Sequence, residues 1–191
     1  MSLGNVPKDF KYRFNWNAPI ISSSHDRSVI YHAGNVVFKT LDQGINWKVI
    51  SPDLTRNNKA HQGPGGGPYT NEAAGGENYN TIMYLTESPH EKAVLWAGSD
   101  DGLVHLTRDG GINWVNVTPK DLPEAIVNSI EVSPHDPATA YITVIAYKFN
   151  NLKPMIYKTS DYGVSWVKRV DGIDNQTIVR VVREDKKVEG L

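Results

Sequence analysis

Short stretches in which apolar and polar residues alternate recur along the chain, separated by turn residues. Residues 81–108 show the pattern most clearly, with "TIMYLTE", "AVLWAG" and "LVHLTR", and "NWVNVT" follows at 113–118. Alternation with many β-branched and aromatic side chains predicts half-buried strands, and the "SDDG" between the second and third stretches predicts a hairpin turn. No segment has a helical period of useful length, so the pattern predicts an all-β protein.

Two turn motifs repeat three times in register with these strands. The first is the box Thr-x-Asp-x-Gly-x-(Asn/Ser)-Trp, found as "TLDQGINW" (40–47), "TRDGGINW" (107–114) and "TSDYGVSW" (159–166). The second is Ser-x-His-(Asp/Glu), which begins at Ser23, Ser88 and Ser133 and precedes each box. Four short antiparallel strands repeated with fixed turns are typical of β-propeller blades, so we expect a propeller segment with the boxes at the turns between strands C and D.

The repeats predict where the units begin and end. We expect a leader and entry strand in 1–13, blades in 14–55, 78–122 and 126–170, a glycine-rich connector in 56–77, and the first strand of an incomplete fourth blade in 174–191. Because a closed ring needs about four or more blades, the chain is expected to be a segment of a longer propeller, with the remaining blades as partners. Pairing of two chains into one ring is the alternative.

The box residues are expected to be structural. The aspartates can accept hydrogen bonds from backbone N–H groups, the glycines allow conformations closed to other residues, and the tryptophans are expected to bury against the blade. A catalytic acid or a calcium ligand is the alternative for the aspartates, but a catalytic group is not needed once in every blade. The structural box residues are Asp42, Gly44, Trp47, Asp109, Gly111, Trp114, Asp161, Gly163 and Trp166.

The three histidines of the second motif invite a metal interpretation. His25, His90 and His135 occupy corresponding turns of different blades, so they are expected to be spread around the ring rather than gathered on one ion. A structural role in the turn is favoured, and no metal or cofactor is expected.

Candidate functional residues lie in the segments that interrupt the repeat. Since strand direction alternates, the turns between strands B and C share one face with the connectors between blades. Residues 51–80 and 146–155 are long irregular segments on that face, and aromatic residues with carboxylates suit sugars or peptides. Ordinary solvated loop residues are the alternative. The ligand-binding candidates are Arg56, Tyr69, Tyr79 and Tyr147, and the catalytic candidates are Glu77, Asp100 and Asp101.

Composition excludes several classes of function. The 20 basic and 21 acidic residues nearly cancel, so no basic footprint for nucleic acid is present. The chain has no cysteine, which excludes disulfides and thiolate metal sites. No apolar run approaches the ~18 residues of a membrane span, so membrane insertion is not expected.

The boxes resemble the Asp-box, or bacterial neuraminidase (BNR) repeat, Ser/Thr-x-Asp-x-Gly-x-x-Trp. The segments "FNWNAPI", "WKVISPDLT", "SPHEKAVLWAGSDDGLVHLTRDGGINW" and "VRVVRED" are similar to large secreted bacterial proteins described as BNR-repeat or sortilin-like glycosyl hydrolases. The resemblance covers essentially the whole chain. It implies a partial multi-bladed propeller from a secreted or periplasmic protein.

Three functions remain open, because a propeller fold does not decide function. The favoured one is a non-catalytic recognition or scaffold segment that binds protein or glycan. The second is part of a glycoside hydrolase acting on polysaccharide, with a carboxylate pair completed by another part of the parent protein. The third is an assembly factor, for which no sequence feature identifies a partner. A sialidase is disfavoured, because the few arginines form no recognisable cluster for a substrate carboxylate.

Overall fold

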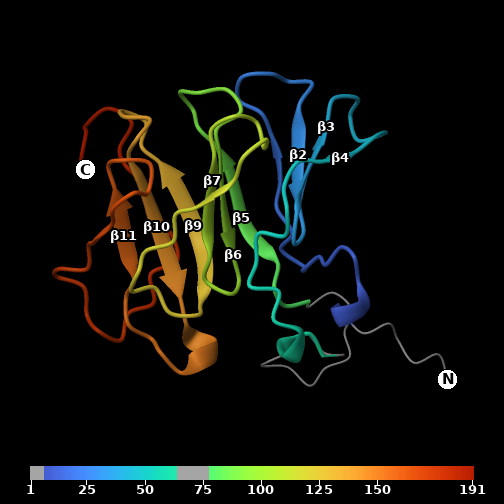
Figure 1. The fold of residues 1–191 in the computed structure, drawn as a ribbon. Coiled ribbons are helices and arrows are strands. Elements are labelled where there is room, and N and C mark those ends of the chain that lie inside the picture. Colours follow the sequence, from blue (N-terminus) through green and yellow to red (C-terminus); the bar gives the residue numbers. More distant parts are fainter. Residues whose placement is uncertain (1–6, 64–77) are drawn as a thin grey trace.

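The computed structural model describes residues 7–63 and 78–191, which form three four-stranded antiparallel sheets. The sheets stand side by side in chain order (Figure 1). Each is a simple meander in which sequence neighbours pair, as expected for a propeller blade. The all-β fold and the three blades are therefore confirmed.

Each blade contains strands A to D in the order in which they occur along the chain. Blade 1 contains β1 (Ile20–Ser22), β2 (Ile30–Ala33), β3 (Val37–Thr40) and β4 (Lys48–Val49). Blade 2 contains β5 (Ile82–Glu87), β6 (Leu95–Ser99), β7 (Val104–Thr107) and β8 (Val115–Asn116). Blade 3 contains β9 (Ile126–Val132), β10 (Ala140–Ile145), β11 (Ile156–Thr159) and β12 (Val167–Lys168).

The hydrophobic cores lie between the blades rather than within them. In β6 of the middle blade, Leu95 and Ala97 pack into the core shared with blade 1, whereas Trp96 packs into the core shared with blade 3. This alternation follows from the period of two in a strand. At Gly98 a Cβ atom would lie 2.4 Å from the Val127 side chain, so the absence of a side chain lets blade 3 approach closely.

The turns separate into two faces, as the alternation of strand direction requires. The three short 3-10 helices η1 (Pro7–Asp9), η2 (Lys59–His61) and η3 (Tyr147–Phe149) all lie at the lower end of the sheets in Figure 1. We call this lower end the loop face. The boxes and the Ser-x-His turns lie at the opposite end.

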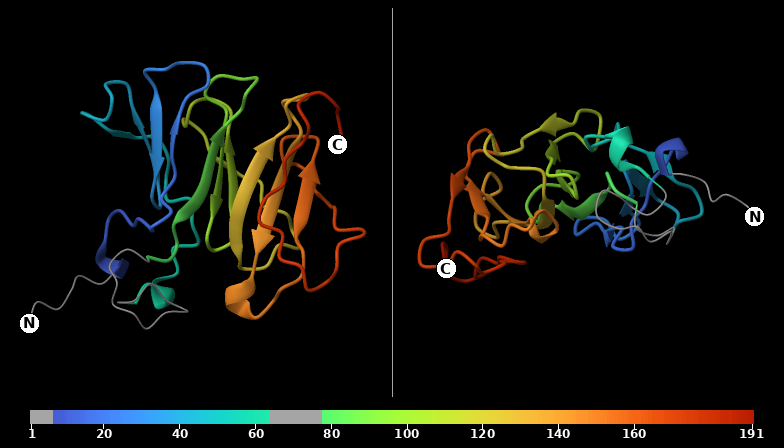
Figure 2. Two further views of the ribbon diagram at one scale, coloured as in Figure 1. Left: turned by 180° about the vertical axis from the view of Figure 1, so that it is seen from behind. Right: turned by 90° about the horizontal axis from the view of Figure 1, so that it is seen from below.

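Two predicted strands are not found among the described residues. Of the range 1–13, which was expected to include an entry strand, the described residues 7–13 contain η1 and no strand. Residues 174–191, expected to begin a fourth blade, contain no strand but run along blade 3 (Figure 2). Asn128 Nδ2 and Thr143 Oγ1 both donate to the Arg180 carbonyl, at 2.6 and 2.7 Å. Within the described ranges, no strand pairs with this segment through backbone hydrogen bonds. Side chains of blade 3 bind its carbonyl groups instead.

Candidate functional site

The three boxes form the same hydrogen-bond network. In the second box, Asp109 Oδ1 accepts from Thr107 Oγ1 at 2.9 Å and from the Asn113 N–H at 2.9 Å, and Gly111 N donates to Thr107 Oγ1 at 2.9 Å. The first and third boxes repeat these contacts around Asp42 and Asp161. Each aspartate thus closes its own turn, as the sequence predicts.

Hydrogen bonding favours the ionised form of all three box aspartates. The backbone N–H of Asn46 is the first of the donors that lower the pKa of Asp42 to about 2. The backbone N–H of Asn113 lowers the pKa of Asp109, and the Ser165 hydroxyl lowers the pKa of Asp161. A carboxylate held ionised by its own turn is a poor proton donor, so these aspartates do not suit the role of a catalytic acid.

Trp114 and Trp166 connect neighbouring blades, which corrects the expectation that each box tryptophan packs only on its own blade. Trp114 Nε1 donates to the Ile50 carbonyl of blade 1 at 2.8 Å, and Trp166 Nε1 donates to the Val117 carbonyl of blade 2 at 2.7 Å. Within 7–63 and 78–191, Trp47 of blade 1 makes no such contact, and it is 39% exposed.

The histidines of the Ser-x-His turns contact the segment that follows their own blade, whereas Trp114 and Trp166 contact the preceding blade. His25 Nε2 lies 2.8 Å from the Ser88 carbonyl of blade 2, and His90 Nε2 lies 2.8 Å from the Ser133 carbonyl of blade 3. His135 makes the same contact with the Asp185 carbonyl at 2.7 Å. Within 7–63 and 78–191 no group of three or more histidine and acidic side chains could hold a metal ion. His25 and His90 are therefore inter-blade contacts, and His135 makes the equivalent contact with the segment that follows blade 3.

On the loop face, the two acidic candidates of blade 2 are buried. Asp100 and Asp101 are 4% and 0% exposed. Asp100 Oδ1 accepts from the Thr81 N–H at 2.9 Å, and its Oδ2 accepts from Thr81 Oγ1 at 3.0 Å. Burial, followed by the charge of Asp101, raises the pKa of Asp100 well above its usual range. Asp100 therefore faces the protein interior, out of reach of a polymeric substrate.

Asp101 holds the connector between blades 1 and 2 in place. Its Oδ2 accepts from the Arg56 N–H at 2.8 Å and from Asn80 Nδ2 at 2.6 Å, and its Oδ1 accepts from Ser99 Oγ at 2.5 Å. Arg56 Nε also donates to the Asp101 carbonyl at 2.7 Å. Burial raises the pKa of Asp101, and these hydrogen-bond donors oppose that rise. The predicted ligand-binding residue Arg56 therefore holds the connector against blade 2.

A tyrosine, a histidine and a glutamate from three segments meet beside this network. The Tyr79 hydroxyl donates to Glu124 Oε1 at 2.5 Å, and His61 Nδ1 lies 3.5 Å from the same oxygen. Tyr79 is 4% exposed, and its burial together with Glu124 raises the pKa of its hydroxyl. Glu124 and His61 are about one third exposed. Glu124 was not predicted from the sequence, because its segment approaches Tyr79 only after the blades have packed.

The 3-10 helix of blade 3 presents apolar side chains to solvent. Tyr147, Phe149 and Leu152 are 45%, 39% and 42% exposed. Lys148 stands between them in the sequence, and its positive charge opposes the rise in the pKa of Asp100. Of the predicted ligand-binding candidates among the described residues, Tyr147 and Arg56 are exposed, and Arg56 is also held by Asp101. Tyr69 and Glu77 lie outside the described residues.

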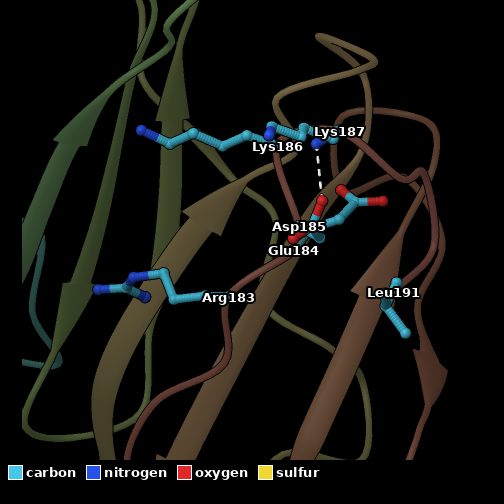
Figure 3. Close-up of a pocket in the computed structure, with 6 residues that line it drawn as sticks. All are labelled: Arg183, Glu184, Asp185, Lys186, Lys187 and Leu191. Atoms are coloured by element: carbon cyan, nitrogen blue, oxygen red, sulfur yellow. Dashed lines mark hydrogen bonds between the residues drawn. The ribbon is translucent and has the colours of Figure 1, made fainter.

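A depression near the end of the chain surrounds a turn that is similar to the Ser-x-His turns. It has a volume of about 560 Å³ and is lined by Arg183, Glu184, Asp185, Lys186, Lys187 and Leu191 (Figure 3). Asp185 Oδ1 accepts from the N–H groups of Lys187 and Val188 at 2.7 and 2.9 Å. Ser88 and Ser133 make the same contacts in their turns. The charged side chains thus surround a structural turn.

The fold is shared with two groups of solved proteins. An ancestral GH74 enzyme matches with a TM-score of 0.57 and 12% identity over 83% of this chain and 18% of that chain. The Niastella koreensis GH74 enzyme matches at 0.52 and 13% over 78% and 22%. YCF48 from Cyanidioschyzon merolae matches at 0.52 and 19% over 88% and 44%. The chain spans less than half of each, and at these identities the likeness supports the β-propeller fold alone.

Other comparisons add no family. No protein-family model matches the sequence. No curated protein matches it either. In the part of the chain that the structure describes, no helix is long and apolar enough to cross a membrane.

Proposed function

We propose that this chain is a non-catalytic recognition or scaffold segment of a secreted or periplasmic Asp-box propeller, and that its loop face binds protein or glycan. The observation that carries the proposal is the contrast on that face. Asp100 and Asp101 are buried in structural hydrogen bonds, whereas Tyr147, Phe149 and Leu152 are open to solvent.

Exposed aromatic rings suit recognition. Tyrosine and phenylalanine bury a large area with few rotatable bonds, so they lose little conformational entropy when a partner covers them. Sugar rings and apolar peptide side chains both pack on such surfaces. The N–H groups of Phe149 and Asn151 donate to the Ala146 carbonyl at 2.9 and 3.2 Å, so backbone hydrogen bonds close the loop on itself. The surface is therefore held in place before a ligand arrives, which reduces the cost of binding.

Arrays of natural glycans and of peptides, probed with the full chain, test the proposal. We expect retention on at least one class of ligand and loss of that retention in the Tyr147→Ala and Phe149→Ala variants. Ile112→Ala is the matched control, because Ile112 is 82% exposed but lies in a box at the opposite end of the blade. An equal loss in all three variants, or no retention on any array, would contradict the proposal.

A glycoside hydrolase segment is the second candidate, and Glu124 is the observation that favours it. Its carboxyl group is partly exposed beside an aromatic ring and a histidine, at 2.5 Å from the Tyr79 hydroxyl. A glycosidase needs two carboxyl groups ~5 to ~9.5 Å apart, so the parent protein would have to supply the other. Hydrolysis of sialosides, β-glucans and xyloglucan by the parent protein tests this function. Turnover that disappears in Glu124→Gln but persists in Asp121→Asn, an acid in the same connector, would establish it.

A further inference from the structure

The contact between neighbouring blades is made twice with the same parts. Gly111 of blade 2 leaves room for Ile50, whose carbonyl oxygen would lie 2.4 Å from a Cβ atom there. The Trp114 indole donates to that same carbonyl. Blade 3 repeats the arrangement with Gly163 and Trp166 against Val117. In each case the acceptor stands three residues after the box tryptophan of the preceding blade.

Blade 1 carries the same parts without an occupant. Gly44 has φ of +92°, close to the +95° of Gly111, so the two boxes share one backbone conformation. A Cβ atom on Gly44 would meet nothing nearer than the Trp47 ring at 3.5 Å. Among residues 7–63 and 78–191, no carbonyl accepts from the Trp47 indole, and this ring is 39% exposed.

The Ser-x-His turn of blade 1 is open in the same way. The carbonyls of Ser88 and Ser133 each contact a histidine from the preceding blade. Ser23 occupies the equivalent position in blade 1. No histidine of the described residues contacts its carbonyl, although its hydroxyl accepts from the His25 and Asp26 N–H groups as the other turns require.

We propose that Ser23, Gly44 and Trp47 form a docking surface, the blade 1 socket, for a further blade that carries both turn motifs. The carbonyl three residues after that blade's box tryptophan accepts from Trp47 Nε1, and its side chain packs on Gly44. A histidine from its Ser-x-His turn donates to the Ser23 carbonyl. The two occupied sockets of this chain supply the geometry for both contacts.

The occupant is a blade from outside this chain's own repeats, rather than blade 3 of a second copy. In a second copy the acceptor position would be Arg169, three residues after Trp166. Stacking there would also require β1 to lie along β9, in the way that β5 packs against β9. That place is taken by the segment whose Arg180 and Asp185 carbonyls contact blade 3. The inference does not depend on what the loop face binds.

Exchange of the indole N–H protons with solvent tests the socket. In the full chain, assigned with a Trp47→Phe variant, the Trp114 and Trp166 protons are expected to exchange at least about tenfold more slowly than the Trp47 proton, because one hydrogen bond is broken before exchange. A fusion that places an extra copy of residues 78–122 ahead of residue 10 supplies a blade with an acceptor at its Val117 position. In this fusion the Trp47 proton should slow by a similar factor.

Gly44→Ala in the fusion is the matched control, and Trp47 should then exchange as fast as in the unmodified chain. A Trp47 proton that stays fast in the fusion would overturn the proposal. The proposal would also be overturned if exchange of the Trp47 proton in the unmodified chain became slower as the protein concentration increased. A second copy of the chain would then be the occupant.

A second measurement needs no added blade. In the unmodified chain, Gly111→Ala should lower the urea midpoint more than Gly44→Ala, because both residues have the same φ and only Gly111 faces a neighbour. Equal losses would show that Gly44 is already covered and would overturn the proposal.

Discussion

Replacing each box tryptophan by phenylalanine separates contacts within a blade from contacts between blades. Phenylalanine keeps an aromatic ring but removes the indole N–H. At Trp166 the substitution removes a 2.7 Å hydrogen bond and leaves the Val117 carbonyl without its donor. A lost hydrogen bond costs about 1 kcal/mol, and the smaller ring buries less apolar area, so we expect a loss of about 2 kcal/mol in the free energy of unfolding.

The same change at Trp47 should cost less than about 0.5 kcal/mol, because this ring is 39% exposed and makes no inter-blade hydrogen bond. Urea denaturation gives the midpoints and slopes, and a loss of 2 kcal/mol in a chain of this size corresponds to about 4–8 °C in the melting temperature. Trp114→Phe should behave as Trp166→Phe does. Similar losses at Trp47 and Trp166 would refute the conclusion that the indole acts across the blade boundary.

Three other changes address the buried polar groups and the histidine contacts. Burial raises the pKa of Asp100 in the folded chain, so the protein loses stability as pH rises above the unfolded value near 3.8. Asp100→Asn should therefore gain stability relative to the unmodified chain as pH rises from 4 to 8 in urea titrations, and a constant difference would contradict the assignment. His90→Ala should cost about 1 kcal/mol by removing the contact with the Ser133 carbonyl, and an unchanged midpoint would contradict that role. Arg13→Ala should cost about 3–5 kcal/mol, because it leaves Asp53 without its 2.7 Å partner; a double-mutant cycle with Asp53→Asn should show strong coupling, and additive losses would argue against the pair.

The sequence was sufficient to predict features that depend on local periodicity. Strand B of blade 2 was expected at 93–98 and is found as β6 (Leu95–Ser99). The box turn was also predictable, because the partners in its hydrogen bonds lie within six residues of Thr107. Such contacts form whatever the neighbouring blade does.

Features that depend on contact between blades could not be predicted in the same way. The indole of Trp166 lies against Val117, which is 49 residues away in the sequence. Asp101 lies in a polar hairpin turn that would be solvated in isolation, but the connector at Arg56 covers it. The order of strands in the sequence was therefore enough to predict which segments lie on the loop face. Which of their side chains are buried depends on segments from other blades.

The most direct test of the proposed function measures binding and turnover in the same samples. The full chain is incubated with each member of a panel of natural glycans and peptides, and retained ligand and released product are both quantified. We predict retention without released product, with retention lost in Tyr147→Ala and kept in Ile112→Ala. Released sugar that depends on Glu124 would contradict it and assign the chain to a hydrolase.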